Sequence, residues 1–202
     1  SLAAGRWDAT PSARLAWLLV IGTLPAGIAG LLLESTAEEA FRSPVLVAAM
    51  LILFSLPLYV SERLGKGDRT LAEAGPLHAL ILGVAQSIAL VPGVSRSGIT
   101  MSAGMLAGFP RRDAAEFTFL LSAPIIAAAG GKQLFDIARG VDANGNADLV
   151  VYAVGLVTAA VVGYATIAFL MRFLRLNRLD VFVYYRLALG CVILALAAAG
   201  VL

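Results

Sequence analysis

The stretch from Gln86 to Thr100 reads Gln-Ser-Ile-Ala-Leu-Val-Pro-Gly-Val-Ser-Arg-Ser-Gly-Ile-Thr and interrupts an otherwise apolar chain. It places an arginine among hydroxyl side chains and glycines. An ionised side chain at membrane depth costs about 3 kcal/mol or more, so an intramembrane arginine indicates a functional site with an anionic partner. We therefore look for the function of this chain around Arg96.

The composition indicates an integral membrane protein. Of 202 residues, 60% are hydrophobic and 14% are charged, whereas soluble domains carry about 25% charged residues. The net charge of +2 is too small to suggest a nucleic-acid partner. We expect an all-α membrane protein that forms one integral membrane domain over residues 1–202.

The apolar runs predict helices at about 14–33, 44–60, 76–91, 117–137, 149–171 and 181–202. The third run is short, because Pro92 and Gly93 should end its helix at Val91. A second short helix is expected from Gly98 to Gly108. Two half-length helices joined by a broken turn predict a re-entrant hairpin over about 76–108, beside about five transmembrane helices.

The basic residues predict the orientation, because cytoplasmic loops carry the excess of lysine and arginine. Suppose that the hairpin enters and leaves on the same side of the membrane. The connections on the side of the N-terminus then hold most of the lysines and arginines, and the connections near 34–43 and 138–149, on the other side of the membrane, hold fewer. We expect a cytoplasmic N-terminus and an external C-terminus.

The central motif has the features of a cradle for an oxyanion. A helix that begins near Ser97 offers unpaired N–H groups and the positive end of its dipole. Gly93 and Gly98 let the backbone approach a ligand closely. Arg96 can bind two phosphate oxygens at once. Hydroxyl donors, or a nucleophile, are available on Ser95, Ser97 and Thr100.

Structural roles compete with these functional ones. A serine at a helix start often only caps the helix, so capping and ligand binding are equally open for Ser97. Thr100 can bond back to its own helix. Gln86 and Ser87 can face the same cavity, although hydrogen bonding between helices is the stronger interpretation. His78 is expected near the lipid interface.

The chain resembles bacterial undecaprenyl-diphosphate phosphatases of the bacitracin-resistance family. The resemblance is carried by Pro92-Gly93-x-Ser95-Arg96-Ser97-Gly98-x-Thr100 with Gln86 before it, and by the stretch from Ala115 to Pro124, Ala-Glu-Phe-Thr-Phe-Leu-Leu-Ser-x-Pro. It implies hydrolysis of the terminal phosphate of a polyprenyl diphosphate, which recycles the lipid carrier for cell-wall synthesis.

The resemblance also implies an inverted-repeat fold in the bacterial inner membrane, a possible homodimer, and a divalent cation, Mg or Ca, for which the chain shows no ligand motif. Carried over to this chain, catalytic roles fall to Arg96, Ser95, Ser97 and Thr100, with substrate binding by Gly93, Gly98 and Gln86.

One departure from the family pattern stands out. The family's first hairpin supplies two glutamates four residues apart and a Pro-x-Ser-Ser-Thr-Gly-His segment, for which this chain has no counterpart. We expect the chain to be truncated at its N-terminus and to hold the larger part of the fold without the first half-site. Glu116, a carboxylate at the head of the span that follows the motif, can cap its helix or pair with Arg112. An alternative function is a transporter or flippase for an anionic polyprenyl phosphate lipid.

Overall fold

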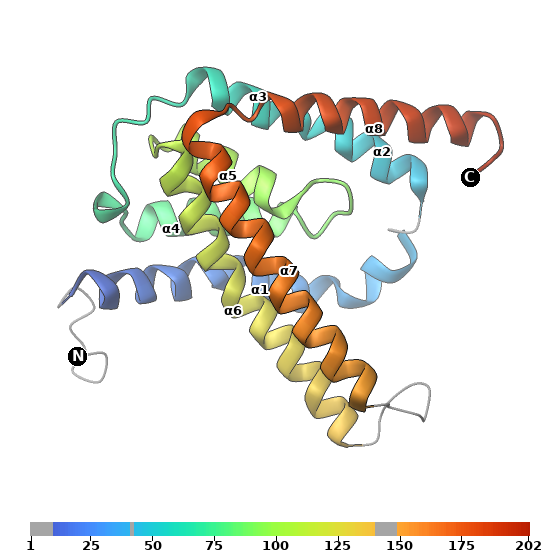
Figure 1. Cartoon of the computed structure of the whole chain (residues 1–202), viewed down its shortest axis with the longest axis horizontal. Coiled ribbons are helices and arrows are strands. Elements are labelled where there is room, and N and C mark those ends of the chain that lie inside the picture. Colours follow the sequence, from blue (N-terminus) through green and yellow to red (C-terminus); the bar gives the residue numbers. More distant parts are fainter. Residues whose placement is uncertain (1–9, 41–42, 140–148) are drawn as a thin grey trace.

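The computed structural model describes residues 10–40, 43–139 and 149–202, and every regular element in these ranges is helical. The helices are α1 (Pro11–Ala40), α2 (Pro44–Leu53), α3 (Ser55–Leu64), a short 3-10 turn (Leu71–Glu73), α4 (Pro76–Ile88), α5 (Arg96–Leu106), α6 (Arg111–Ala138), α7 (Leu149–Leu176) and α8 (Asp180–Ala198). Figure 1 shows their arrangement.

Five stretches of these helices are long and apolar enough to cross a membrane. They cover residues 11–33, 44–64, 111–135, 150–176 and 180–198. A stretch of about 20 apolar residues is what a helix needs to span the hydrocarbon. The expectation of an all-α protein with about five spanning helices is confirmed, and the chain is a multi-pass membrane protein.

The second spanning stretch is broken into α2 and α3 at Phe54. Pro57 has no N–H with which to bond the carbonyl of Leu53, so the regular helix cannot continue through this position. Near the break, the Ser55 hydroxyl donates a hydrogen bond to the carbonyl of Leu51 at 2.7 Å.

α4 and α5 form an antiparallel hairpin at the centre of the fold. The ring of His78, near the start of α4, lies 5.3 Å from the ring of Phe109, just beyond the end of α5. The two open ends of the hairpin are therefore adjacent, and residues 89–95 form its tip. α4 ends at Ile88, three residues before the predicted end at Val91, because a run of turns over 89–91 precedes the proline.

The start of α5 also differs from the prediction. The helix begins at Arg96 and ends at Leu106, whereas the sequence suggested residues 98–108. Ser95 rather than Ser97 is its N-cap residue. Whether this hairpin enters and leaves the membrane on one side stays a prediction.

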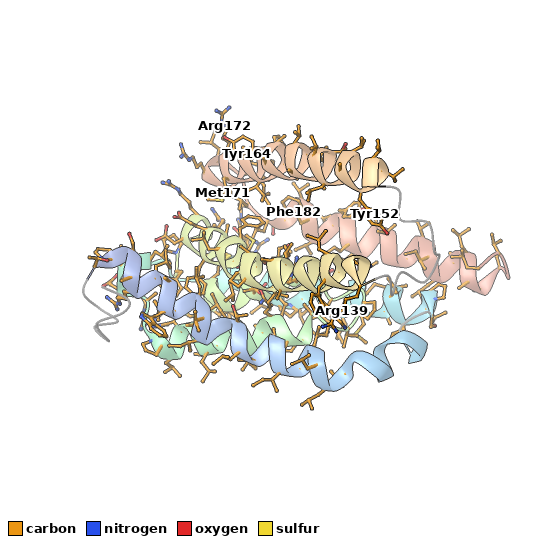
Figure 2. The ribbon with its side chains drawn as sticks, turned by 90° about the horizontal axis from the view of Figure 1, so that it is seen from below. Arg139, Tyr152, Tyr164, Met171, Arg172 and Phe182 are labelled. Atoms are coloured by element: carbon orange, nitrogen blue, oxygen red, sulfur yellow. The ribbon has the colours of Figure 1, made fainter. Side chains whose placement is uncertain are left out.

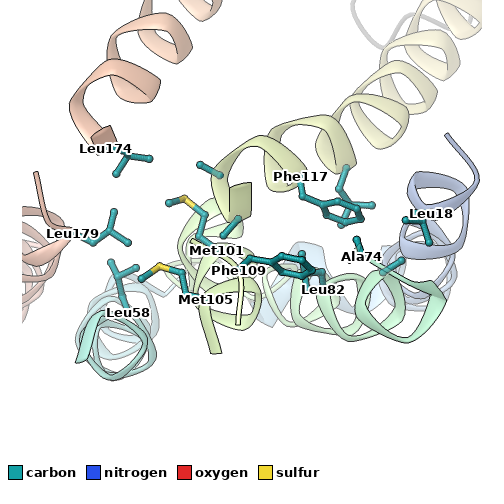
Figure 3. Close-up of a cluster of buried hydrophobic side chains, with 14 of the residues drawn as sticks. Leu18, Leu58, Ala74, Leu82, Met101, Met105, Phe109, Phe117, Leu174 and Leu179 are labelled. Atoms are coloured by element: carbon teal, nitrogen blue, oxygen red, sulfur yellow. The ribbon is translucent and has the colours of Figure 1, made fainter. Parts of the chain in front are cut away.

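Glycines hold the hairpin against its neighbours. A side chain at Gly83 of α4 would clash with the carbonyl oxygen of Gly22 of α1, and one at Gly104 of α5 would meet Ala114 of α6 at 3.0 Å. Such close helix approach through small residues is typical of membrane proteins. The buried core continues around α5, with Met101 and Met105 at its centre (Figure 3).

The C-terminal helix reaches the hairpin tip. α8 runs beside α2 and α3 (Figure 1), and Gly190 lets it approach the carbonyl oxygen of Ala48, 3.0 Å from the position of an added Cβ. By contrast, α7 runs back beside α6 with almost its whole surface open. Tyr164 and Arg172 on α7 point away from the rest of the chain (Figure 2).

Candidate functional site at the hairpin tip

The tip of the hairpin has an unusual backbone. Gly93 has φ of +92° and Ser95 has φ of 71°. A left-handed conformation at a non-glycine residue costs of the order of 1–3 kcal/mol and persists only where its surroundings impose it. A Cβ at Gly93 would clash with the carbonyl oxygen of Val47, so this glycine is required by the contact with α2 as well as by its dihedral angle.

This backbone leaves a row of free donors at the start of α5. The Ser95 hydroxyl accepts from the N–H of Gly98 at 3.2 Å, and the Ser95 carbonyl accepts from the N–H of Ile99 at 3.0 Å. Within the described ranges, the N–H groups of Ser95, Arg96 and Ser97 have no hydrogen-bond acceptor. Successive free N–H groups around a left-handed residue form a concavity suited to an anion.

Arg96 occupies the first turn of α5 and is exposed. Across the described part of the chain its guanidinium makes no hydrogen bond and no ion pair. It lines two cavities. The first, here the α1-side cavity, has a volume of about 360 Å³ and also includes Ala26, Gln86 and Ile125. The second, the α6-side cavity, has a volume of about 580 Å³ and also includes Ser97 and Ser122.

Gln86 is brought to Arg96 by the hairpin. The side chain is only 2% exposed, and neither its amide nitrogen nor its amide oxygen has a hydrogen-bond partner. The expected bonding between helices is therefore wrong for Gln86. It is also wrong for Ser87, whose hydroxyl donates to Gly83 of its own helix at 3.0 Å. Buried polar groups are nearly always bonded, so an unpaired amide at a cavity indicates room for a ligand or water.

Thr100 lies one turn beyond Arg96 but is fully buried. Its hydroxyl has no partner and reaches neither cavity beside Arg96. The packing of α4, α5 and α6 explains this burial. Leu82 and Ala114 both face Gly104. One helical turn closer to the tip, the corresponding residues of the three helices are Gln86, Thr118 and Thr100, which therefore lie in one layer. The two cavities beside Arg96 are therefore lined without Thr100, and the catalytic role that the family resemblance implies for it stays a prediction.

Ser97 and Gly98 face a third cavity on the opposite side of α5. This α8-side cavity has a volume of about 340 Å³ and is lined by Ser95, Ser97, Gly98 and Arg186 together with apolar side chains. Ser97 lines both this cavity and the α6-side cavity, and its hydroxyl makes no hydrogen bond to any described residue. A Cβ at Gly98 would meet the Ser95 hydroxyl at 3.0 Å.

Arg186 was missed by the sequence analysis. It lies on α8, is 6% exposed, and donates from Nη2 to the carbonyls of Gly93 at 2.9 Å and Val94 at 3.0 Å. The signal was available, because Arg186 is a second arginine within an apolar run. What no spacing could reveal is that the run carrying it packs against the tip, 93 residues earlier in the chain.

A second group missed by the sequence analysis lies at the far end of α3. The Glu62 side chain is fully buried and accepts from Arg111 Nε at 2.8 Å and from Arg178 Nε at 3.2 Å. The N–H of Leu179 adds a bond at 3.4 Å. This carboxylate joins α3, α6 and the start of α8. We call it the Glu62 junction.

His78 and Glu116 are the other candidate acid–base groups named from the sequence. His78 Nδ1 accepts from the N–H of Gly75 at 3.1 Å, and its Nε2 lies 2.7 Å from Arg69. Burial, and then the charge of Arg69, lower the pKa of His78. Glu116 neither caps α6 nor pairs with Arg112, since its carboxylate has no partner among the described residues. Asp113, in the first turn of α6, accepts from the N–H of Leu71 instead.

The tip does not offer the ligands of a divalent cation. No group of three or more His, Cys, Asp or Glu side chains occurs together in the described ranges. The polar groups around Arg96 are N–H donors, hydroxyls and one amide, whereas Mg²⁺ and Ca²⁺ require several oxygen ligands, usually carboxylates. The residues present fit an anion rather than a cation, and the divalent cation stays a prediction.

The fold and the site define a multi-pass helical membrane protein with a positively charged, donor-rich hairpin tip. A family model described as bacitracin resistance protein BacA matches residues 2–192. This chain belongs to the BacA family.

Several relatives with known names support this assignment. The undecaprenyl-diphosphatase of Kineococcus radiotolerans is 43% identical over 95% of this chain and 67% of its own length. Those of Anaeromyxobacter sp. (strain K) and Pelobacter propionicus are 46% and 41% identical over 100% and 95% of this chain, and 68% and 70% of their own lengths. The chain thus spans about two thirds of these relatives.

Proposed function

We propose that this chain is an undecaprenyl-diphosphatase that converts a polyprenyl diphosphate to its monophosphate and so recycles the carrier lipid for cell-wall synthesis. Hydrolysis breaks the bond between the bridging oxygen and the terminal phosphorus, and water supplies the oxygen of the released phosphate. The family match and the names of the relatives support the reaction.

The observation that carries this proposal is the unpartnered Arg96 beside three free backbone N–H groups. A diphosphate brings several anionic oxygens, and a guanidinium can bind two of them in its fork geometry. Donors fixed in place before the ligand arrives also stabilise charge that develops on phosphoryl oxygens. In this proposal Arg96 holds the diphosphate, and the N–H groups of Ser95 and Ser97 bind further oxygens.

The hydroxyl groups divide between two roles. Ser95 already accepts a hydrogen bond from Gly98, so it shapes the tip and has only its O–H left to donate. Ser97 is free to bond a phosphate oxygen from the α6-side cavity. Gln86 would use its unpaired amide from the α1-side cavity.

We infer the setting of the site from the sequence. The hairpin re-enters a bacterial inner membrane, the N-terminus of the chain is cytoplasmic and the C-terminus is external. In the family pattern, a first hairpin with two glutamates and a histidine faces this tip, so the residues described here form one half of a two-part site. A homodimer also remains among the expectations.

A transporter of the same lipid would need the same anion site. The names of the relatives favour the phosphatase, because each is called an undecaprenyl-diphosphatase. The test is to reconstitute the chain in vesicles with undecaprenyl diphosphate, and to measure released phosphate and movement of the lipid between leaflets. An N-terminally extended form is measured beside it.

The expected result is phosphate release that is abolished by Arg96→Ala and poorly restored by Arg96→Lys. Lysine keeps the charge but cannot reproduce the two-point contact. Lipid movement between leaflets without phosphate release, in both the chain and the extended form, would overturn the phosphatase proposal.

A further inference from the structure

Arg186 contacts the hairpin tip from behind. Its Nη2 donates to the carbonyls of Gly93 and Val94, and a longer contact of 3.5 Å reaches the carbonyl of Met50 on α2. The side chain is 6% exposed. A single guanidinium therefore joins α8, α2 and the tip.

The charge of Arg186 is not neutralised by these contacts. In the described residues its hydrogen-bond partners are all backbone carbonyls, and no carboxylate forms an ion pair with it. A buried charge without a counter-ion is costly and is retained where it has a role. Arg186 consequently adds positive potential to the same tip that carries Arg96.

The carbonyl bonds fix the direction of the neighbouring N–H groups. In a planar trans peptide, the C=O and the following N–H point in opposite directions. Because the Gly93 and Val94 carbonyls point toward Arg186, the N–H groups of Val94 and Ser95 point away from it. The Ser95 N–H begins the row of free donors that continues through Arg96 and Ser97.

We propose that Arg186 is a positioning residue for the anion site. Its guanidinium turns the negative ends of two peptide groups away from the ligand and holds Ser95 in its left-handed conformation, so that the donors of Ser95, Arg96 and Ser97 face one place. The role as a holder of the tip stands on the contacts alone, while its value to the ligand rests on the proposed function.

The first test needs no ligand. Hydrogen exchange is measured at the amides of Gly98 and Ile99, which are bonded to the side chain and carbonyl of Ser95. In Arg186→Met we expect exchange at both amides to accelerate roughly tenfold, because bonds to a charged donor are lost. Arg186→Lys, which keeps the charge and a donor, should lie between Arg186→Met and the wild type.

Arg14→Met is the matched control. Arg14 also donates to two backbone carbonyls, those of Ala72 at 2.9 Å and Ala74 at 2.6 Å, but at the open end of the hairpin. Its loss should loosen the segment near Ala74 and leave Gly98 and Ile99 unchanged. Should Arg186→Met fail to fold, Arg186→Lys becomes the deciding variant, with faster exchange at Gly98 and Ile99 as the expected result.

The second test uses undecaprenyl diphosphate in detergent micelles. Arg186→Met should weaken its binding roughly tenfold while Arg14→Met does not. Unchanged exchange at Gly98 and Ile99 in a folded variant would overturn the proposal, and so would weaker binding without faster exchange, since that pattern marks direct contact with the ligand. A wild-type chain that binds no diphosphate, with fast exchange in Arg186→Met, would overturn the proposed function and leave the holding role intact.

Discussion

The hairpin tip and the Glu62 junction each bury one charged side chain, Arg186 and Glu62 respectively, yet the two charges are balanced differently. At the junction one buried carboxylate meets two arginines and a backbone N–H. At the tip two arginines lie near three free N–H groups, and the described residues supply no carboxylate partner to either arginine. The junction is complete by itself, whereas the tip has donors without acceptors.

This difference separates structural charge from functional charge. A buried carboxylate with all its partners holds helices together and leaves nothing for a ligand to bind. A group of donors that lacks acceptors is unfavourable until an anion arrives, and that cost is a reason to look for the anion. The contrast can be tested by removing residues from each region and measuring stability and binding separately.

The largest effect is expected from Arg96→Ala at the tip. Undecaprenyl diphosphate should bind about 4 kcal/mol more weakly, or roughly a thousandfold in Kd, as is typical when one partner of a hydrogen-bonded charge pair is removed. The melting temperature should not fall, because Arg96 is exposed and has no partner in the described part of the chain. Microscale thermophoresis measures the Kd, and scanning fluorimetry measures the melting temperature. A melting temperature several degrees lower with unchanged binding would make Arg96 a structural residue.

The next largest effect is expected from Glu62→Ala at the junction, which should lower stability rather than binding. Stability should fall by about 3 kcal/mol, the lower end for a broken buried pair, because Arg111 and Arg178 are partly exposed and can turn to water. Thermal inactivation in detergent measures the loss.

Asp180→Asn is the control for this variant. Its carboxylate pairs with Arg63 and Arg178 but is itself partly exposed, so the change should lower stability far less than Glu62→Ala does. Equal losses in Glu62→Ala and Asp180→Asn would show that burial does not distinguish the two pairs.

A smaller effect should come from Gly93→Ala, which tests the shape of the tip rather than its charge. The new methyl group meets the carbonyl oxygen of Val47 in a left-handed backbone, so we expect a cost of about 2 kcal/mol together with weaker diphosphate binding. Gly27→Ala on α1 is the control, since nothing lies within 4 Å of its Cβ position. It should stabilise the helix slightly, by about 0.5 kcal/mol. Diphosphate binding that survives Gly93→Ala would show that the tip need not hold this backbone.

The smallest effect is expected from Gln86→Leu. Stability should stay within about 1 kcal/mol of the wild type, because the buried amide has no hydrogen bonds to lose. Binding of the diphosphate should weaken severalfold if the amide serves the ligand. Thr118→Val is the control: it removes a buried hydroxyl that also lacks a hydrogen-bond partner, and it should leave binding unchanged. Equal binding by Gln86→Leu and the wild type would remove Gln86 from the site.

Much of the fold could be predicted from the sequence because lipid imposes a simple rule on helices. Apolar runs of about 20 residues and the Pro92-Gly93 interruption are local features, and they predicted the spanning helices and the two short helices. The helix ends were wrong by two to three residues, since Ser95 and Ser97 are both good caps and tertiary contacts select between them.

The sequence predicted only the part of the candidate site that lies within one motif. Arg96, Ser95 and Ser97 stand in one motif, so their proximity needed no knowledge of the fold. Arg186 and Glu62 come together with distant segments through the packing of α8 on α2 and α3, and one chain read alone contains no signal for such pairings. Thr100 shows the converse case, because it stands in the motif but is buried and lines neither cavity beside Arg96.

The contact between Gly22 and Gly83 has a mechanical consequence. Main chain rests on main chain there, with no flexible side chain in between, so the first helix and the hairpin must shift as a unit. A site this rigid loses little conformational entropy when it binds its ligand. Most of the conformational entropy lost on binding is then that of the long, flexible lipid.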